Sequence, residues 1–291
     1  LPMESEPKAH DRSVMSALFA PVTLGSLTLK NRLIMPAATT HYDHEAGDRD
    51  LAFLAERAQG GVALIVHRGK VVYQKGFGYD DPEKKVPIRP DHIYRIASQT
   101  KAITSVGVMM LVEEGKVSLE QPVSDFIPTF KKTTVAVKGA NGEVTFEPAK
   151  RPITLRHLLT HTSGLSYGVW HPLMNQYSDI TKMGNPIAPV VPLMFDPGTN
   201  WQYGYSTDWV GRFVESVSGM NLQQYLRKNV LDPLGMKDTT FVFPKEKFDR
   251  LVGRYQRQPD GSLTPVMRAM PVTPPVFRGD GGLFSTAPDY L

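Results

Sequence analysis

The sequence contains no cysteine. That absence excludes disulfide bonds, zinc sites built from thiolates and a cysteine nucleophile, and it is compatible with any redox compartment. No apolar run approaches the roughly 20 residues that a membrane-spanning helix needs, so we expect no membrane association. The first residues, Leu1–Arg12, are polar and lack the apolar core of a secretion signal. On these grounds we expect the protein to be cytoplasmic rather than periplasmic.

Long stretches of like charge are also missing. The net charge is only +4, and the Lys and Arg residues are interspersed with Asp and Glu rather than gathered in a basic stripe. Proteins that bind nucleic acid concentrate basic residues on one surface, so the sequence indicates no nucleic-acid partner. What the chain does have is length, because 291 residues are enough to bury one large core or two smaller ones.

Strand and helix patterns are spread along the chain. Runs of β-prone residues around glycine-containing turns predict three hairpins, at residues 22–29, at residues 62–78 and around Asn141-Gly142. Residues 166–200 are rich in Pro, Gly and Asn, which is typical of a long loop that carries function. Apolar residues at helical spacing predict helices over residues 49–59, 98–114, 155–160, 208–218 and 222–230.

The tetrapeptide Ser98-Gln-Thr-Lys101 opens the predicted helix that ends at Gly115. Positions i and i+3 of a helix lie on one face, with Cβ atoms roughly 5–6 Å apart. A serine hydroxyl is a weak nucleophile until a base takes its proton, and a partly desolvated lysine can act as that base. The helix N-terminus adds positive charge that favours an anionic intermediate. Without further context, the same four residues also fit a capping serine followed by a solvent-facing lysine.

The sequence around this tetrapeptide resembles the nucleophile helix of class C β-lactamases, D-alanyl-D-alanine peptidases and family VIII carboxylesterases. The similarity is clear from Tyr94 to Leu119 and covers about residues 61–291. It implies an α/β fold of the β-lactamase or penicillin-binding-protein type. In that fold helices flank an antiparallel sheet, and a mostly helical subdomain follows the nucleophile helix. Further matching segments come in the family's order: Pro122–Pro128, Ile153–Leu165, Leu231–Met236 and Gly281–Ala287.

A second motif of these families is Tyr-x-Asn, which becomes Tyr-x-Ser in the esterases. The segment Pro197-Gly-Thr-Asn-Trp201-Gln-Tyr203 resembles the esterase pattern and implies that Tyr203 is the catalytic tyrosine. By the same resemblance we expect Trp201, Gln99 and Tyr205 to contact the substrate. Tyr205 stands where the usual residue is Asn or Ser, and the loss of that amide contact favours esters over β-lactams. The alternative interpretation of Tyr203 is a packed aromatic residue whose hydroxyl caps a loop.

Other candidate nucleophiles and metal ligands have weaker contexts. Ser206 is one residue short of a Gly-x-Ser-x-Gly elbow, and Ser163 lies in a glycine-flanked turn where a capping role is expected. His157 and His161 are four residues apart but have no third ligand at zinc-site spacing. The same holds for the cluster His41-Tyr-Asp-His44-Glu. We therefore expect packing or surface roles for these residues and no metal site.

Residues 18–66 resemble a different family, the flavin-dependent old yellow enzymes. In that family, backbone near Pro36–Thr39 would contact FMN. A (β/α)₈ barrel needs about 250 residues, however, and this segment supplies only its first unit, which cannot form a flavin pocket. We therefore expect a fusion, in which residues 1–60 are an N-terminal appendage to a serine hydrolase domain over residues 61–291. No organic cofactor is expected.

The related hydrolases continue beyond the point that matches Leu291 and carry a third motif there, Lys-Thr-Gly, His-x-Gly or Trp-Gly-Gly. No such motif follows Ala287 in this sequence. The resemblance therefore implies a hydrolase domain truncated at its C-terminal side, with an unpaired sheet edge. A strand from a second copy could pair with that edge, which makes a homo-oligomer one expectation.

Together these patterns predict a serine carboxylesterase that hydrolyses short-chain esters of small molecules through an acyl-enzyme on Ser98. Lys101 is the expected base, Tyr203 shares that role and protonates the leaving group, and the backbone N–H of Ser98 is one oxyanion donor. Three alternatives stay open: a class C-type β-lactamase or D-alanyl-D-alanine peptidase, a flavin oxidoreductase, and a catalytically impaired relic or binding module.

Overall fold

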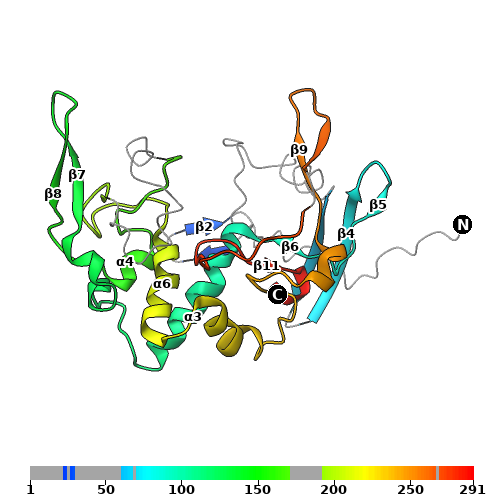
Figure 1. The fold of residues 1–291 in the computed structure, drawn as a ribbon, viewed down its shortest axis with the longest axis horizontal. Coiled ribbons are helices and arrows are strands. Elements are labelled where there is room, and N and C mark those ends of the chain that lie inside the picture. Colours follow the sequence, from blue (N-terminus) through cyan, green and yellow to red (C-terminus); the bar gives the residue numbers. More distant parts are fainter. Residues whose placement is uncertain (1–21, 25–26, 30–59, 68–69, 171–191, 267–268) are drawn as a thin grey trace, which may run out of the picture. The chain divides into compact units, whose positions relative to one another are not determined.

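The chain divides into two compact units, Leu1–His44 and Glu45–Leu291, whereas the sequence predicts a boundary at residue 60. The predicted helix over residues 49–59 and the cluster His41–Glu45 lie outside the described residues. The computed structural model describes residues 22–24, 27–29, 60–67, 70–170, 192–266 and 269–291 (Figure 1).

The first unit contains an antiparallel hairpin. Strand β1 (Val22–Leu24) pairs with β2 (Leu27–Leu29), with Val22 opposite Leu29. This confirms the hairpin that the sequence predicts around Gly25-Ser26.

The second unit begins on a larger antiparallel hairpin. Strand β3 (Gly60–His67) pairs with β4 (Lys70–Asp81), and β5 (Val86–Pro87) adds to the other edge of β4. The hairpin predicted at residues 62–78 is therefore confirmed. Neighbouring strands of a (β/α)₈ barrel run parallel, so β3 does not have the pairing that the old yellow enzyme resemblance requires.

A short pair of strands leads into the central helix. Strand β6 (Tyr94–Arg95) pairs with β11 (Phe284–Ser285), and the two lie side by side in Figure 1. After β6 a 3₁₀ turn, Ala97–Gln99, runs directly into α3 (Thr100–Glu113). Gly115, with φ of +68°, follows the end of this helix as the sequence predicts.

Three further helices follow α3 in the chain: α6 (Ser206–Ser218) and α7 (Leu222–Leu226) pack against α3, and α4 (Leu155–Leu159) packs against α6. The side chain of Thr154 caps α4, and that of Asn221 caps α7. Between them, α6 ends at Gly219, whose φ of +69° suits a glycine. The helix that the sequence predicts over residues 222–230 continues from α7 as a π-helical turn, Arg227–Leu231.

The remaining elements are short. The hairpin predicted around Asn141-Gly142 is confirmed, with β7 (Thr134–Lys138) paired to β8 (Val144–Pro148). The other elements are the 3₁₀ turns Val123–Asp125, Pro128–Lys132 and Lys245–Arg250, the antiparallel strands β9 (Arg254–Arg257) and β10 (Leu263–Val266), and α8 (Ala287–Tyr290).

Among the described residues, no helix is both long and apolar enough to cross a membrane.

The main core lies where these helices meet. Phe213 of α6 is fully buried and packs edge-on against Phe126, with ring centroids 5.0 Å apart. Gly107 lets α3 approach α7, because a Cβ atom there would lie 2.7 Å from Cδ2 of Leu226. A second, smaller cluster surrounds β6 and β11, formed by Ile93, Phe243, Leu251 and Phe284.

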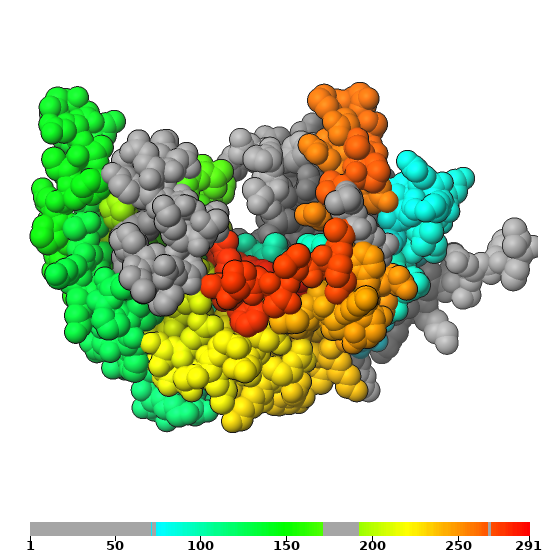
Figure 2. Space-filling view, in the orientation of Figure 1, coloured from blue at the N-terminus to red at the C-terminus, as the bar shows by residue number. Residues whose placement is uncertain are grey.

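The segment before β11 lies directly on α6. A Cβ atom at Gly279 would be 2.4 Å from the carbonyl oxygen of Thr207 and 3.0 Å from Cα of Gly211, so the two backbones are in contact. In Figure 2 this segment, in red, borders the yellow residues of α6. This contact brings the C-terminal part of the described chain to the first turn of α3.

We expect Phe213→Ala to reduce the free energy of unfolding by about 3–5 kcal/mol, because it leaves a cavity between α6 and Phe126. Phe146→Ala is the matched control, since that side chain is 45% exposed on β8. The measurement is the thermal midpoint of unfolding for both variants. Equal shifts for the two would contradict the assignment of the core.

Candidate active site

Ser98 lies at the point where β6 gives way to α3. The residue before it, Ala97, has a φ of +43°, a left-handed conformation that is strained for a residue with a Cβ atom. Strain of this kind persists where the surrounding structure fixes it, and it is concentrated at functional sites. The strained turn leaves Ser98 half-buried at the wall of a cavity.

Two side chains donate hydrogen bonds to the hydroxyl of Ser98. Lys101 Nζ lies 3.0 Å from Ser98 Oγ, and the hydroxyl of Tyr203 lies 3.1 Å from the same atom. Lys101 Nζ also donates to the carbonyl oxygen of Asp280 at 2.8 Å. The structure thus brings together the serine, lysine and tyrosine that the sequence analysis singles out. A nucleophile with a base within hydrogen-bond reach is the arrangement that acyl transfer needs.

Backbone contacts hold the tyrosine loop in place. The N–H of Gly198 donates to the carbonyl of Thr162 at 2.7 Å, and the N–H of Gln202 donates to the carbonyl of His161 at 2.9 Å. Gly198 has a φ of +82° and lies against His157, where a Cβ atom would be 2.8 Å from Nε2. The turn after α4 therefore positions the segment that presents Tyr203.

The three residues predicted to bind substrate occupy different positions. Trp201 is 60% exposed, and its ring centroid lies 6.3 Å from that of His161. Gln99 is half-buried, and its carbonyl accepts a hydrogen bond from the Tyr290 hydroxyl at 3.0 Å. Tyr205 is only 3% exposed and belongs to the core. Direct contact between Tyr205 and a substrate is therefore not what this geometry favours.

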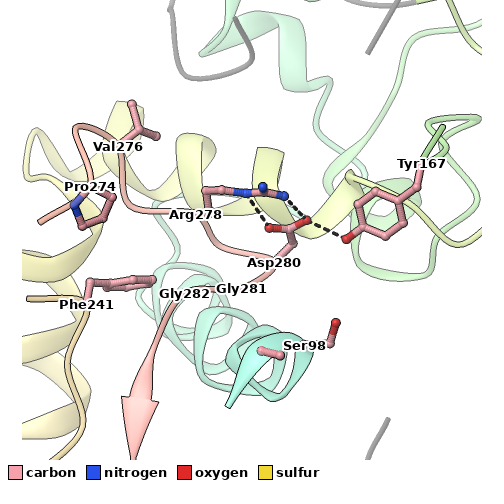
Figure 3. Close-up of a pocket in the computed structure, with 10 residues that line it drawn as sticks. Ser98, Tyr167, Phe241, Pro274, Val276, Arg278, Asp280, Gly281 and Gly282 are labelled. Carbon is pink, nitrogen blue, oxygen red and sulfur yellow. Dashed lines mark hydrogen bonds and ion pairs between the residues drawn. The ribbon is translucent and has the colours of Figure 1, made fainter. Parts of the chain in front are cut away.

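A cavity of about 350 Å³ lies beside Ser98. Its apolar wall is formed by Phe241, Pro274 and Val276 (Figure 3). The other lining residues are Ala97, Tyr167, Arg278, Asp280, Gly281 and Gly282.

The polar part of this cavity contains three residues that sequence reasoning missed. The Tyr167 hydroxyl donates to Asp280 Oδ2 at 2.6 Å. Arg278 donates from Nε and from a terminal nitrogen to the two carboxylate oxygens of Asp280, at 3.0 and 2.8 Å. Figure 3 shows Arg278 and Tyr167 on opposite sides of Asp280. The only signal in the sequence is the Arg-Gly-Asp before Gly281, which has no spacing that indicates chemistry.

Burial sets the ionisation of the groups around Ser98. Burial and the nearby Lys101 ammonium lower the pKa of His161 to about 4, so this imidazole, whose ring centroid lies 4.8 Å from that of Tyr203, is neutral at neutral pH. Burial and the charge of Asp280 raise the pKa of the Tyr167 phenol, which therefore stays protonated as a donor. Burial and Asp280 also raise the pKa of Asp208 to about 7.

The competing serines and histidines have structural roles. Ser163 and Ser206 are fully buried, and their hydroxyl oxygens lie 2.8 Å apart. Ser163 Oγ also accepts from the N–H of Leu165, which fits the predicted capping role. His157 Nδ1 accepts from the N–H of Thr154 at the start of α4. Among the described residues, no group of three or more acidic, histidine or cysteine side chains could hold a metal ion.

Comparison with known proteins gives a consistent picture. The family model described as Beta-lactamase matches residues 44–291. Among curated proteins, the acyltransferase calJ of Penicillium decumbens is 33% identical over 237 residues, which are 77% of this chain and 56% of that protein. Esterase EstB of Burkholderia gladioli is 32% identical over 255 residues, covering 83% of this chain and 61% of that protein. The chain thus spans little more than half the length of these relatives.

Solved structures agree with the fold. Unliganded simvastatin synthase LovD from Aspergillus terreus, as its selenomethionyl derivative, has a TM-score of 0.69 and 31% identity, covering 84% of this chain and 67% of that one. EstCE1, a hydrolase with promiscuous acyltransferase activity, has a TM-score of 0.65 and 26% identity, covering 84% and 71%. The β-lactamase-like fold class predicted from the sequence is confirmed.

The second resemblance, to the old yellow enzymes, is not supported. The family match begins at residue 44, so it includes residues 44–66, which the sequence analysis assigned to a flavoenzyme unit. The antiparallel pairing of β3 with β4 also differs from a barrel unit. The comparisons give no support to an old yellow enzyme segment. With a family match over residues 44–291 and fold neighbours of the same kind, this chain belongs to the β-lactamase family.

Proposed function

We propose that this protein is a serine carboxylic ester hydrolase that forms an acyl-enzyme on Ser98. The observation that supports this most directly is the convergence of Lys101 Nζ and the Tyr203 hydroxyl on Ser98 Oγ, at 3.0 and 3.1 Å. The neutral amine of Lys101 takes the proton of the serine hydroxyl. The oxygen of Ser98 then attacks the ester carbonyl carbon, and the carbonyl electrons move onto its oxygen. The backbone N–H of Ser98 is a donor to that oxyanion.

Collapse of the tetrahedral adduct breaks the bond between the carbonyl carbon and the alcohol oxygen. The departing oxygen takes a proton from Tyr203, which recovers it from the Lys101 ammonium. A water molecule then attacks the acyl-enzyme carbonyl and gives a proton to the same basic pair. The bond between the acyl carbon and Ser98 Oγ breaks, the serine oxygen takes that proton back, and the acid is released. Nζ of Lys101 lies 4.9 Å from the ring centroid of Tyr203, so its charge favours the transient phenolate.

Acyl transfer is the second candidate, because it uses the same acyl-enzyme. The names of two relatives, the acyltransferase calJ and a monacolin J acid methylbutanoyltransferase of Aspergillus terreus, indicate transfer to an acceptor. An alcohol that replaces water in the second step would give that outcome. The apolar wall of Phe241, Pro274 and Val276 beside Ser98 is compatible with an apolar acyl group or acceptor.

β-Lactam hydrolysis fits the site less well. A β-lactam antibiotic carries a carboxylate that needs a cationic anchor, and the cation that lines this cavity, Arg278, is already paired through two hydrogen bonds with Asp280. Tyr205, which stands where lactamases carry an amide-binding Asn, is buried. Both features weaken lactam binding more than ester binding.

We expect Ser98→Ala to abolish covalent labelling by a fluorophosphonate probe and to lower ester turnover by at least about 1,000-fold, because the nucleophile is removed. Intact-mass measurement and peptide mapping identify the labelled residue. Ser105→Ala, on the same helix, is the matched control and should label like the wild type. Residual labelling at Ser163 or Ser206 in the Ser98→Ala variant would show that another serine is the nucleophile.

We expect Lys101→Arg to lower the rate of ester hydrolysis by at least about 100-fold although it keeps the positive charge. Arginine does not give up its proton in the accessible pH range, so it cannot act as the base. Lys116→Arg, an exposed lysine beyond the end of the same helix, is the control and should leave kcat unchanged. Near-wild-type turnover in Lys101→Arg would make the lysine an electrostatic residue only.

We expect kcat/KM for p-nitrophenyl butyrate to exceed that for nitrocefin by at least about 100-fold, because an aryl ester has a good leaving group and needs no carboxylate anchor. Both substrates are compared on one preparation. A primary alcohol added to the ester assay separates transfer from hydrolysis, since transfer yields a new ester by mass spectrometry. A nitrocefin value equal to the ester value would favour a β-lactamase, and no turnover of either by folded protein would favour a binding module.

A further inference from the structure

Lys101 is held at two points, only one of which belongs to the reacting groups. Its Nζ donates to Ser98 Oγ and to the carbonyl oxygen of Asp280, at 3.0 and 2.8 Å. A lysine side chain has four rotatable bonds, so one hydrogen bond leaves its direction poorly fixed. The second bond directs the amine toward Ser98. The position of the Asp280 carbonyl therefore decides how well the amine faces the serine.

The backbone around Asp280 does not fix that carbonyl by itself. Glycines precede and follow the residue, at Gly279, Gly281 and Gly282, and Gly282 has a φ of +106°. Glycine has more conformational freedom than any other residue, so this segment needs contacts from outside it to keep one conformation.

The side chain of Asp280 supplies those contacts. It is 2% exposed, and the Arg278 guanidinium and the Tyr167 hydroxyl together contact both of its carboxylate oxygens (Figure 3). Paired, charge-assisted hydrogen bonds of this kind are short and directional. Resting on the proposed role of Lys101 as the base, we infer that Asp280, held by Arg278 and Tyr167, is the positioning residue that aims Lys101 at Ser98.

The neighbouring residue, Gly279, forms hydrogen bonds with side chains of two helices. The N–H of Gly279 donates to Asp208 Oδ1 of α6 at 3.1 Å, and its carbonyl accepts from Thr104 Oγ1 of α3 at 2.9 Å. Thr104 is one turn of α3 beyond Lys101, so the carbonyl and the amine share one support. Gly279 therefore keeps the segment on α3 and α6, so that loss of the Asp280 side-chain contacts would alter the position of the Asp280 carbonyl locally.

The described residues around the Lys101 amine include Asp280, Tyr167, Tyr203 and His161. The main-chain carbonyl of Asp280 accepts a hydrogen bond from Nζ at 2.8 Å, and the ring centroids of Tyr203 and Tyr167 lie 4.9 and 5.9 Å from Nζ. His161 is neutral at neutral pH because burial and the Lys101 charge lower its pKa to about 4.

The test compares Asp280→Asn, Tyr167→Phe and the double variant in the full chain. The readouts are the rate constant of fluorophosphonate labelling at Ser98 between pH 5 and pH 10 and the thermal midpoint of unfolding. Asp238→Asn is the matched control, because Asp238 also accepts two hydrogen bonds from one arginine, Arg250, at 3.0 and 2.7 Å, and lines no part of the cavity.

We expect labelling to slow about 100-fold in Asp280→Asn, since misplacement of a reacting group by about 1 Å can cost that much. Tyr167→Phe removes one hydroxyl and keeps the ring, so it should slow labelling about 10-fold with little change in unfolding. If Tyr167 acts through Asp280, the double variant is no slower than Asp280→Asn. The Asp238→Asn rate should stay within about threefold of wild type.

Labelling of Asp280→Asn and Tyr167→Phe at the wild-type rate would overturn the inference and leave the proposed function intact. A loss of rate that follows the thermal midpoint alone, in the control as in the other variants, would also overturn it, because it would show a structural role. If Asp280→Asn does not fold, Tyr167→Phe decides. Failure of wild-type protein to label at Ser98 would instead refute the proposed function, and the inference with it.

Discussion

The geometry of the candidate active site depends on the contact between the start of α6 and the glycine-rich segment before β11. Their backbones touch at Gly279, Thr207 and Gly211, and side chains of α3 donate hydrogen bonds to the carbonyls of Gly279 and Asp280. Any side chain larger than hydrogen at Gly279 would separate them. Because the segment lies so close, a carbonyl from it reaches Lys101 at 2.8 Å.

Buried charged side chains are also concentrated at this place, and their charges must be paired. Two buried carboxylates, Asp208 and Asp280, lie around Arg278, and each also accepts a hydrogen bond from a backbone N–H or a tyrosine hydroxyl. Burying charged groups costs free energy unless pairing and hydrogen bonding offset it. Such a network adds little to the net free energy of unfolding, but it fixes the positions of its side chains. A fixed position of Asp280 suits the proposed role of this residue in directing the Lys101 amine.

Much of the fold could be predicted from the sequence, because its signals are local. Glycine turns marked the hairpins at Asn141-Gly142 and residues 62–78, and Gly115 marked the end of α3. The spacing of Ser98 and Lys101 likewise follows from one helical turn. Tyr203 came from a motif rather than from spacing, since nothing local places it beside a serine 105 residues away.

What the sequence could not give depends on tertiary contacts. Asp280 and Tyr167 meet across 113 residues, and neither belongs to a pattern with a chemical spacing. Tyr205 was predicted at the substrate because it follows Tyr203 by two positions. In the structure, however, the chain turns into α6 there, and the side chain enters the core. The flavoenzyme resemblance lacks support for a similar reason. A strand that looks alike in isolation is defined by its partner, and the partner of β3 is antiparallel.

The pairing of β6 with β11 also has a consequence for how the protein matures. Strand β6, which leads to Ser98, pairs with residues 284–285. Lys101 donates a hydrogen bond to the carbonyl of Asp280, 179 residues further along the chain. Contacts between residues so distant in sequence form late, because closing a long loop costs entropy before the contact repays it. During synthesis, the serine and the lysine therefore emerge long before the groups that orient them. The proposed nucleophile is therefore synthesised well before the carbonyl and the strand partner that orient its surroundings.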